Sequence, residues 1–81
     1  SKGEPFHLEQ GTASYSDGKY REAITSGRIA LKINPSSVAA RILLARANLA
    51  LNIFDSAQKF AEDALAAQPD NVEASDVLAG V

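Results

Sequence analysis

The stretch NIFDSAQKFAEDALAAQP, residues 52–69, and the stretch GKYREAITSGRIALKINP, residues 18–35, follow the same pattern. When one is laid over the other their prolines coincide, and the shift between the two copies is 34 residues. Small residues then fall on small residues and apolar residues on apolar ones, as Ala30 falls on Ala64. Self-similarity at a fixed period predicts that one supersecondary unit is built more than once.

Each copy carries the periodicity of an α-helix. Ala23, Ile24, Ala30 and Leu31 recur at i, i+1, i+7 and i+8, which is one face of a helix. No segment alternates convincingly between apolar and polar residues, and β-branched residues are sparse, so we expect no strands. The pattern predicts five helices, over residues 5–17, 20–33, 37–50, 54–67 and 71–80.

The residues between these segments are of the kinds that end one helix and begin the next. Gly18 and Asn52 follow the first and third segments, where a left-handed residue ends a helix. Pro35 and Pro69 follow the second and fourth segments, which they cannot continue. Short connections predict that neighbouring helices run antiparallel. The candidate N-caps of the third and fifth helices are Ser36 or Ser37, and Asp70 or Asn71.

These stretches resemble the turn and second helix of a tetratricopeptide repeat, a helix–turn–helix unit that recurs every 34 residues. The resemblance implies an all-α fold of antiparallel helix pairs in a right-handed superhelical stack. It also implies two repeats and a C-terminal capping helix within one domain, and a chain that is a slice of a longer array. The expected boundaries are residues 1–81 for the domain, about 4–37 and 38–71 for the repeats, and about 72–81 for the last helix.

Departures from the family pattern concern the interior. Ser14, Gly27, Asn48 and Ala61 stand at positions where the family often packs aromatic side chains between paired helices. We therefore expect an alanine-rich core and helices that approach closely, with small residues at the crossings: Gly11, Ala23, Ala30, Ala45, Ala57 and Ala64. For Asn48 two interpretations are open, a bond to a neighbouring backbone carbonyl or contact with a ligand. Alanine-rich repeats of this kind resemble bacterial arrays of cell-envelope and polysaccharide-export proteins.

The last helix has a simple expected role. Its apolar residues should cover the second repeat and its acidic ones should face water, because a terminal repeat needs a polar outer face. The apolar residues are Val72, Val77, Leu78 and Val81, and the acidic ones are Glu73 and Asp76.

The resemblance places a binding groove on the concave surface, which the first helix of each repeat lines. Leu8 over Ile42 and Tyr15 over Leu49 would form two apolar rungs, and Arg46 would supply a charged hydrogen-bond donor between them. We therefore predict a non-catalytic module that takes an apolar helix or an extended peptide from a protein partner. The predicted groove residues are Leu8, Thr12, Tyr15, Ile42, Arg46, Leu49 and Asp76, with Glu73 beside them.

An alternative function uses the same residues differently. If another repeat or a second copy of the chain covers these rungs, the domain is a structural spacer or a self-association element in a larger protein, and a homo-oligomer is possible. The chaperone-binding clamp of some tetratricopeptide domains is absent, because the matching positions supply no suitable cation or amide: Leu8, Thr12, Leu43, Glu73 and Val77.

Composition argues against other classes of function. The chain has no cysteine and one histidine, His7, so we predict no metal site and no cofactor, and we expect no enzyme. The net charge is −2 and the basic residues are dispersed among acidic ones, which argues against nucleic acid as a partner. No apolar run approaches the roughly 20 residues that span a bilayer. We expect a soluble protein and no membrane insertion, and either a cytoplasmic or a periplasmic compartment fits.

Overall fold

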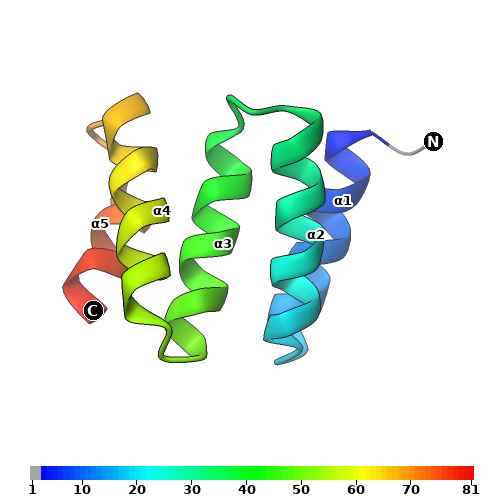
Figure 1. Ribbon diagram of the computed structural model, residues 1–81, viewed down its shortest axis with the longest axis horizontal. Coiled ribbons are helices and arrows are strands. Elements are labelled where there is room, and N and C mark those ends of the chain that lie inside the picture. Colours follow the sequence, from blue (N-terminus) through cyan, green and yellow to red (C-terminus); the bar gives the residue numbers. More distant parts are fainter. Residues whose placement is uncertain (1–2) are drawn as a thin grey trace.

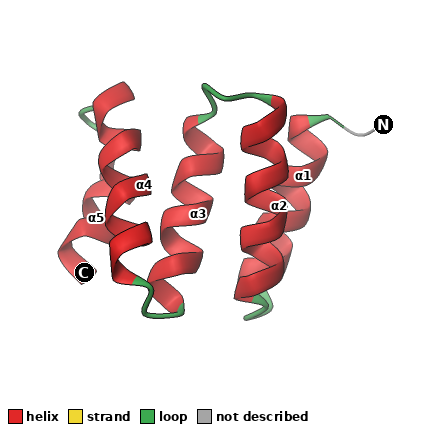
Figure 2. Ribbon diagram, viewed as in Figure 1, coloured by secondary structure: helices red, strands yellow, loops and turns green. Residues whose placement is uncertain are grey.

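The computed structural model describes residues 3–81, which fold into α-helices joined by short turns (Figure 1). Residues 1 and 2 of the predicted domain lie outside the described residues. No strand occurs within residues 3–81 (Figure 2), and each predicted helix is confirmed with ends within one residue of those expected. The helices are α1 (Glu4–Ser16), α2 (Tyr20–Ile33), α3 (Val38–Ala50), α4 (Phe54–Ala67) and α5 (Val72–Gly80).

The turns that close the helix pairs α1–α2 and α3–α4 have the same geometry. Gly18 and Asn52 both adopt left-handed backbone, with φ of 78° and 61°, as their sequence positions predict. After α1, the N–H of Lys19 donates to the carbonyl of Ser14 at 2.8 Å, and the equivalent bond after α3 measures 2.9 Å. These bonds satisfy carbonyls that a helix end otherwise leaves free.

The turns that connect one pair to the next are also alike. Residues 34–37 and 68–71 each form a four-residue turn with proline second, closed by a 3.0 Å bond from the last N–H to the first carbonyl. The last residue of each turn then caps the following helix. Its side-chain oxygen accepts from the N–H three residues on, at 3.1 Å for Ser37 and 2.9 Å for Asn71. The later candidate is thus the N-cap in both repeats.

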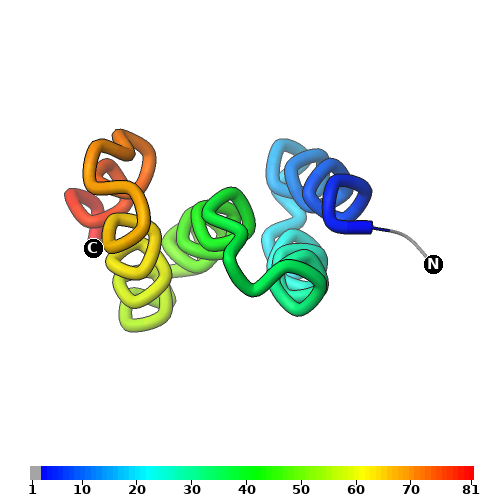
Figure 3. The backbone as a smooth tube through the Cα atoms, turned by 90° about the horizontal axis from the view of Figure 1, so that it is seen from above, coloured from blue at the N-terminus to red at the C-terminus, as the bar shows by residue number. Residues whose placement is uncertain are grey.

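The helices form a stack in which α3 is central. Seen from above, α1 and α5 lie on one side of α3, and α2 and α4 lie on the other (Figure 3). Consecutive helices pack against each other, and α3 contacts each of the other four. Both faces of the stack therefore have α3 as their floor.

The core is built mostly from alanine. Leu44 is the one large side chain of the described residues that is fully buried, whereas nine alanines are 0% exposed. The six small residues expected at helix crossings are all buried. Such a core offers little apolar area per residue, so contacts between repeats are needed for stability.

Glycines in the first repeat make room for leucines of α3. A Cβ added at Gly27 in α2 would lie 2.9 Å from Cγ of Leu44, and one added at Gly11 in α1 would overlap Leu43. The same atom at Gly11 would lie 3.1 Å from Cβ of Ser26, so α1 and α2 also approach closely there. The missing side chains admit neighbours from both the same repeat and the next.

Two polar residues are buried in this core, and Asn48 is one of them. Asn48 is 4% exposed, and its Nδ2 donates to the carbonyl of Leu44 at 2.7 Å. The first interpretation of Asn48, a bond to a neighbouring backbone carbonyl, is therefore confirmed. This bond uses Nδ2 of the side chain and does not involve Oδ1.

The last helix covers the second repeat with fewer residues than expected. Ala74, Val77 and Leu78 pack on the core, but Val72 is 69% exposed and Val81 is 44% exposed, so the expectation for these two valines is wrong. Val72 lies two residues before Ala74, about 200° around the helix, and therefore on the opposite face. Val81 follows the end of the helix.

Candidate functional site

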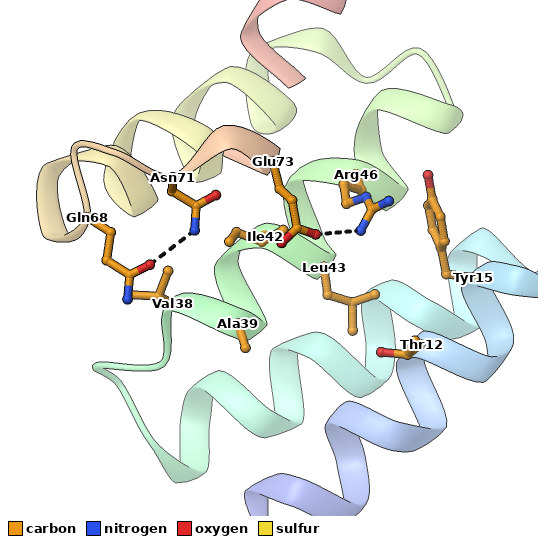
Figure 4. Close-up of a pocket in the computed structure, with 10 residues that line it drawn as sticks. All are labelled: Thr12, Tyr15, Val38, Ala39, Ile42, Leu43, Arg46, Gln68, Asn71 and Glu73. Atoms are coloured by element: carbon orange, nitrogen blue, oxygen red, sulfur yellow. Dashed lines mark hydrogen bonds and ion pairs between the residues drawn. The ribbon is translucent and has the colours of Figure 1, made fainter. Parts of the chain in front are cut away.

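A hollow of about 440 Å³ opens between α1, α3 and α5, and we call it the concave groove (Figure 4). Its lining comes from these three helices and from the turn before α5. This volume is in the range of sites that bind small molecules or a few side chains. The lining residues are Thr12, Tyr15, Val38, Ala39, Ile42, Leu43, Arg46, Gln68, Asn71 and Glu73.

The floor of the concave groove is apolar and belongs to α3. Ile42 and Leu43 each lie three or four residues from both Ala39 and Arg46, which places the four on one face of the helix. Ile42 and Leu43 are only 8% and 7% exposed. The groove therefore presents only a narrow apolar strip, because most of the surface of Ile42 and Leu43 is buried in the core.

Arg46 is held between two other helices of the groove. Its Nη1 lies 2.9 Å from Oε2 of Glu73 in α5, and its guanidinium carbon lies 5.3 Å from the ring centroid of Tyr15 in α1 (Figure 4). The side chains of Arg46 and Glu73 are 45% and 58% exposed. An ion pair this open contributes at most about 1 kcal/mol. Glu73, expected to face water beside the groove, thus also contacts Arg46 of α3.

A second, smaller hollow adjoins the first. It has a volume of about 150 Å³ and shares Tyr15, Arg46 and Glu73 with the concave groove. The ion pair of Arg46 and Glu73 therefore lies between the two hollows. The remaining lining residues of the smaller hollow are Leu49, Asp76 and Val77.

The structure brings most of the predicted groove residues together. The larger hollow contains Thr12, Tyr15, Ile42 and Arg46, and the smaller one adds Leu49 and Asp76. Leu8 lines neither hollow. It packs against a buried cluster of Ala23, Leu43 and Ala47, whereas Ile42 belongs to a different cluster. Leu8 and Ile42, which were predicted to lie side by side in the groove, therefore belong to different hydrophobic clusters.

Five lining residues were not predicted, namely Val38, Ala39, Leu43, Gln68 and Asn71. A signal for Ala39 was present in the sequence, because the spacing that links Ile42, Arg46 and Leu49 reaches residue 39 when extended one turn back. Gln68 and Asn71 belong to the turn between repeats, for which helical periodicity carries no information.

Other features of the described residues bear on the class of function. No three His, Asp or Glu side chains of residues 3–81 are grouped so that they could hold a metal ion. The ring of His7 packs edge-on against that of Phe6, with centroids 5.2 Å apart. Within the same residues, no helix combines the length and the apolar character that crossing a membrane requires.

Comparison with known proteins agrees with the arrangement of the helices. A family model described as tetratricopeptide repeat matches residues 14–80, which is most of the chain. Searches of curated proteins and of solved structures gave no match. The repeated turns, the 34-residue period and the family match lead to one conclusion: the chain belongs to the tetratricopeptide repeat family.

Proposed function

We propose that this chain is a non-catalytic interaction module that holds a peptide or protein segment in the concave groove. The observation that carries the proposal is a groove of about 440 Å³ with an apolar floor on α3 and polar groups at its edges. Concave sites of this composition bind ligands by burying apolar groups and orienting them with a few hydrogen bonds. Tetratricopeptide repeats generally mediate interactions between proteins.

Gln68 supplies a hydrogen-bond donor at one edge of the concave groove. Oε1 of Gln68 accepts from Nδ2 of Asn71 at 3.0 Å, whereas Nε2 of Gln68 makes no hydrogen bond within residues 3–81. Gln68 is exposed. Its free amide can therefore donate to a backbone carbonyl of a bound segment whose apolar side chain lies on Ile42.

The test is to select peptides from a displayed library on the immobilised chain and to map the bound peptide by ¹⁵N chemical shifts. Thr12→Arg places a long cation at the groove wall and should abolish binding. Gln10→Arg is the matched control, because it makes the same change of charge at another exposed position of α1. Equal binding by the two variants, or shifts confined to residues outside the groove, would sink the proposal.

A second function, a structural spacer or self-association element in a larger protein such as a cell-envelope or polysaccharide-export protein, has a different observation in its favour. Val72 and Val81, at 69% and 44% exposed, leave apolar surface open at the start of α5 and just beyond its end. Light scattering over a concentration series distinguishes the two functions. A mass that grows with concentration, and that falls when Tyr15→Ala is combined with Leu49→Ala, favours assembly. A constant mass together with peptide binding that this double variant loses favours the groove.

A further inference from the structure

The face opposite the concave groove carries a separate cleft. It lies between α2 and α4, with the end of α3 and the turn after it as the floor, and has a volume of about 360 Å³. Figure 3 shows α2 and α4 together on this side of α3. We call it the convex cleft. Its lining residues are Arg21, Ile24, Thr25, Arg28, Asn48, Leu51, Ile53 and Ser56.

The charge of the convex cleft is positive and uncompensated. Arg21 and Arg28 are exposed, and neither makes an ion pair or a side-chain hydrogen bond within the described part of the chain. No carboxylate lines the cleft. In the concave groove, by contrast, the one arginine is already paired with Glu73.

The floor of the cleft supplies an acceptor. Asn48 is 4% exposed, and its Nδ2 is used by the carbonyl of Leu44, which fixes the orientation of the amide. Its Oδ1 accepts no hydrogen bond within residues 3–81, yet no fully buried side-chain oxygen of those residues lacks a partner. Oδ1 of Asn48 is therefore accessible at the cleft, where it can accept an N–H of a ligand.

The spacing of the arginines selects the shape of the ligand. Arg21 and Arg28 are two helical turns apart, so their Cα atoms are about 10 Å from each other along α2. In an extended polyproline II segment, residues i and i+3 lie on the same side and about 9 Å apart. The segment between them would pass over Ile24 and Leu51, which also line the cleft.

We propose that the convex cleft binds an acidic peptide segment in extended conformation. Its carboxylates at i and i+3 pair with Arg21 and Arg28, and a backbone N–H donates to Oδ1 of Asn48. The site is independent of the concave groove, because the two share no lining residue. Its charges are exposed, so binding is weak at physiological salt and strengthens as salt is lowered.

Fluorescence anisotropy with labelled synthetic peptides tests this assignment. A peptide with the core Glu-Pro-Leu-Glu should bind at low salt. The same peptide with glutamine at both acidic positions should bind at least tenfold more weakly, and one with its two glutamates adjacent should fall in between. Equal binding of the acidic and glutamine peptides, or no binding of the acidic one at low salt, would overturn the proposal.

Variants locate the site on the protein. Arg21→Gln and Arg28→Gln should each weaken binding roughly three- to fivefold, as expected for one exposed charge pair. Lys32→Gln removes one cation from the same helix outside the cleft, and it should leave binding unchanged. An effect of Lys32→Gln equal to that of Arg28→Gln would mean attraction by net charge alone and would contradict a site.

Chemical-shift mapping of ¹⁵N-labelled chain gives a readout independent of the substitutions. The acidic peptide should shift residues 21–28 and 48–56 and leave residues 68–76 unchanged. Shifts centred on residues 68–76 would assign the peptide to the concave groove and overturn the proposal. So would a single-stranded oligouridine that bound residues 21–28 more tightly than the acidic peptide.

Discussion

Leu44 of α3 fills the space beside Gly27 of α2. A Cβ atom added at residue 27 would lie 2.9 Å from Cγ of Leu44 and 3.0 Å from its Cδ2. Leu44 is also the one large side chain of the described residues that is fully buried. The contact joins the first repeat to the second, and it exists only because residue 27 has no side chain.

Gly27→Ala should therefore destabilise the domain, although alanine is the better helix former by about 1 kcal/mol. Overpacking a filled core costs about 1–3 kcal/mol, and a Cβ only 2.9 Å from Cγ of Leu44 places this site in the upper part of that range, above the gain. Leu44→Ala should cost about 2–5 kcal/mol. In the double variant the penalty of Gly27→Ala should disappear, because the clash is gone. Urea unfolding of the four proteins measures this coupling. An unchanged penalty in the Leu44→Ala background would refute the contact as its cause.

The left-handed backbone at residue 18 should tolerate asparagine better than alanine. Gly18→Ala should cost about 1–2 kcal/mol, because a Cβ disfavours φ of 78°. Gly18→Asn should cost less, since asparagine already adopts this conformation at residue 52 with φ of 61°. Thermal unfolding of both variants gives the comparison. No difference between alanine and asparagine at residue 18 would show that backbone strain does not decide the outcome.

The cap of α3 gives a prediction with a control next to it. Ser37→Ala should cost about 1 kcal/mol, because Oγ of Ser37 accepts from the N–H of Ala40 at 3.1 Å. Ser36→Ala changes a neighbouring exposed serine whose side chain makes no such bond, and it should be neutral within about 0.5 kcal/mol. Equal effects in urea unfolding would exclude the cap as the source.

A fourth prediction concerns how the stability of the domain depends on pH. Hydrogen bonding by Ser37, and by Nδ2 of Asn34 at 3.0 Å, holds the pKa of Glu4 below its usual value of 4.5. Because the unfolded chain then binds the proton first as pH falls, this stabilisation is present above pH 4.5 and is lost as pH passes through the lowered pKa. Glu4→Gln should reduce the loss of stability on acidification, which urea unfolding at a series of pH values measures. The effect is small and screened by salt, since Glu4 is at the surface. If the free energy of unfolding falls with pH in the same way for Glu4→Gln and for the parent chain, the prediction is contradicted.

The helices and turns that repeat could be predicted from the sequence alone. Gly18 and Asn52, and the two prolines, mark turns whose backbone geometry depends on the residues in them, so local chemistry determined the helix ends. The bond of Asn48 to a backbone carbonyl also followed from burial, because a buried amide needs a partner within reach.

The contacts between repeats could not be predicted from local sequence patterns. The pair of Arg46 and Glu73 joins residues 27 positions apart, a separation that is not the repeat. Which side chains line a hollow depends on the tilt of α5 against α3, and periodicity within a helix does not specify that tilt. Leu8 was expected in the groove, but it packs against Ala23, Leu43 and Ala47, a contact that depends on how α1 sits on α2 and α3. Val72 has a different cause, because its position two residues before Ala74 already puts it on the opposite face of α5.

The central place of α3 determines how the domain loses its structure. Since α3 contacts every other helix, detaching it opens all of those interfaces together. Unfolding is then a single cooperative event for the two repeats, and backbone amides of α3 exchange with solvent only when the whole domain opens. The outer turns of α1 and α5 have neighbours on one side only, so their amides exchange through local fraying at far lower cost.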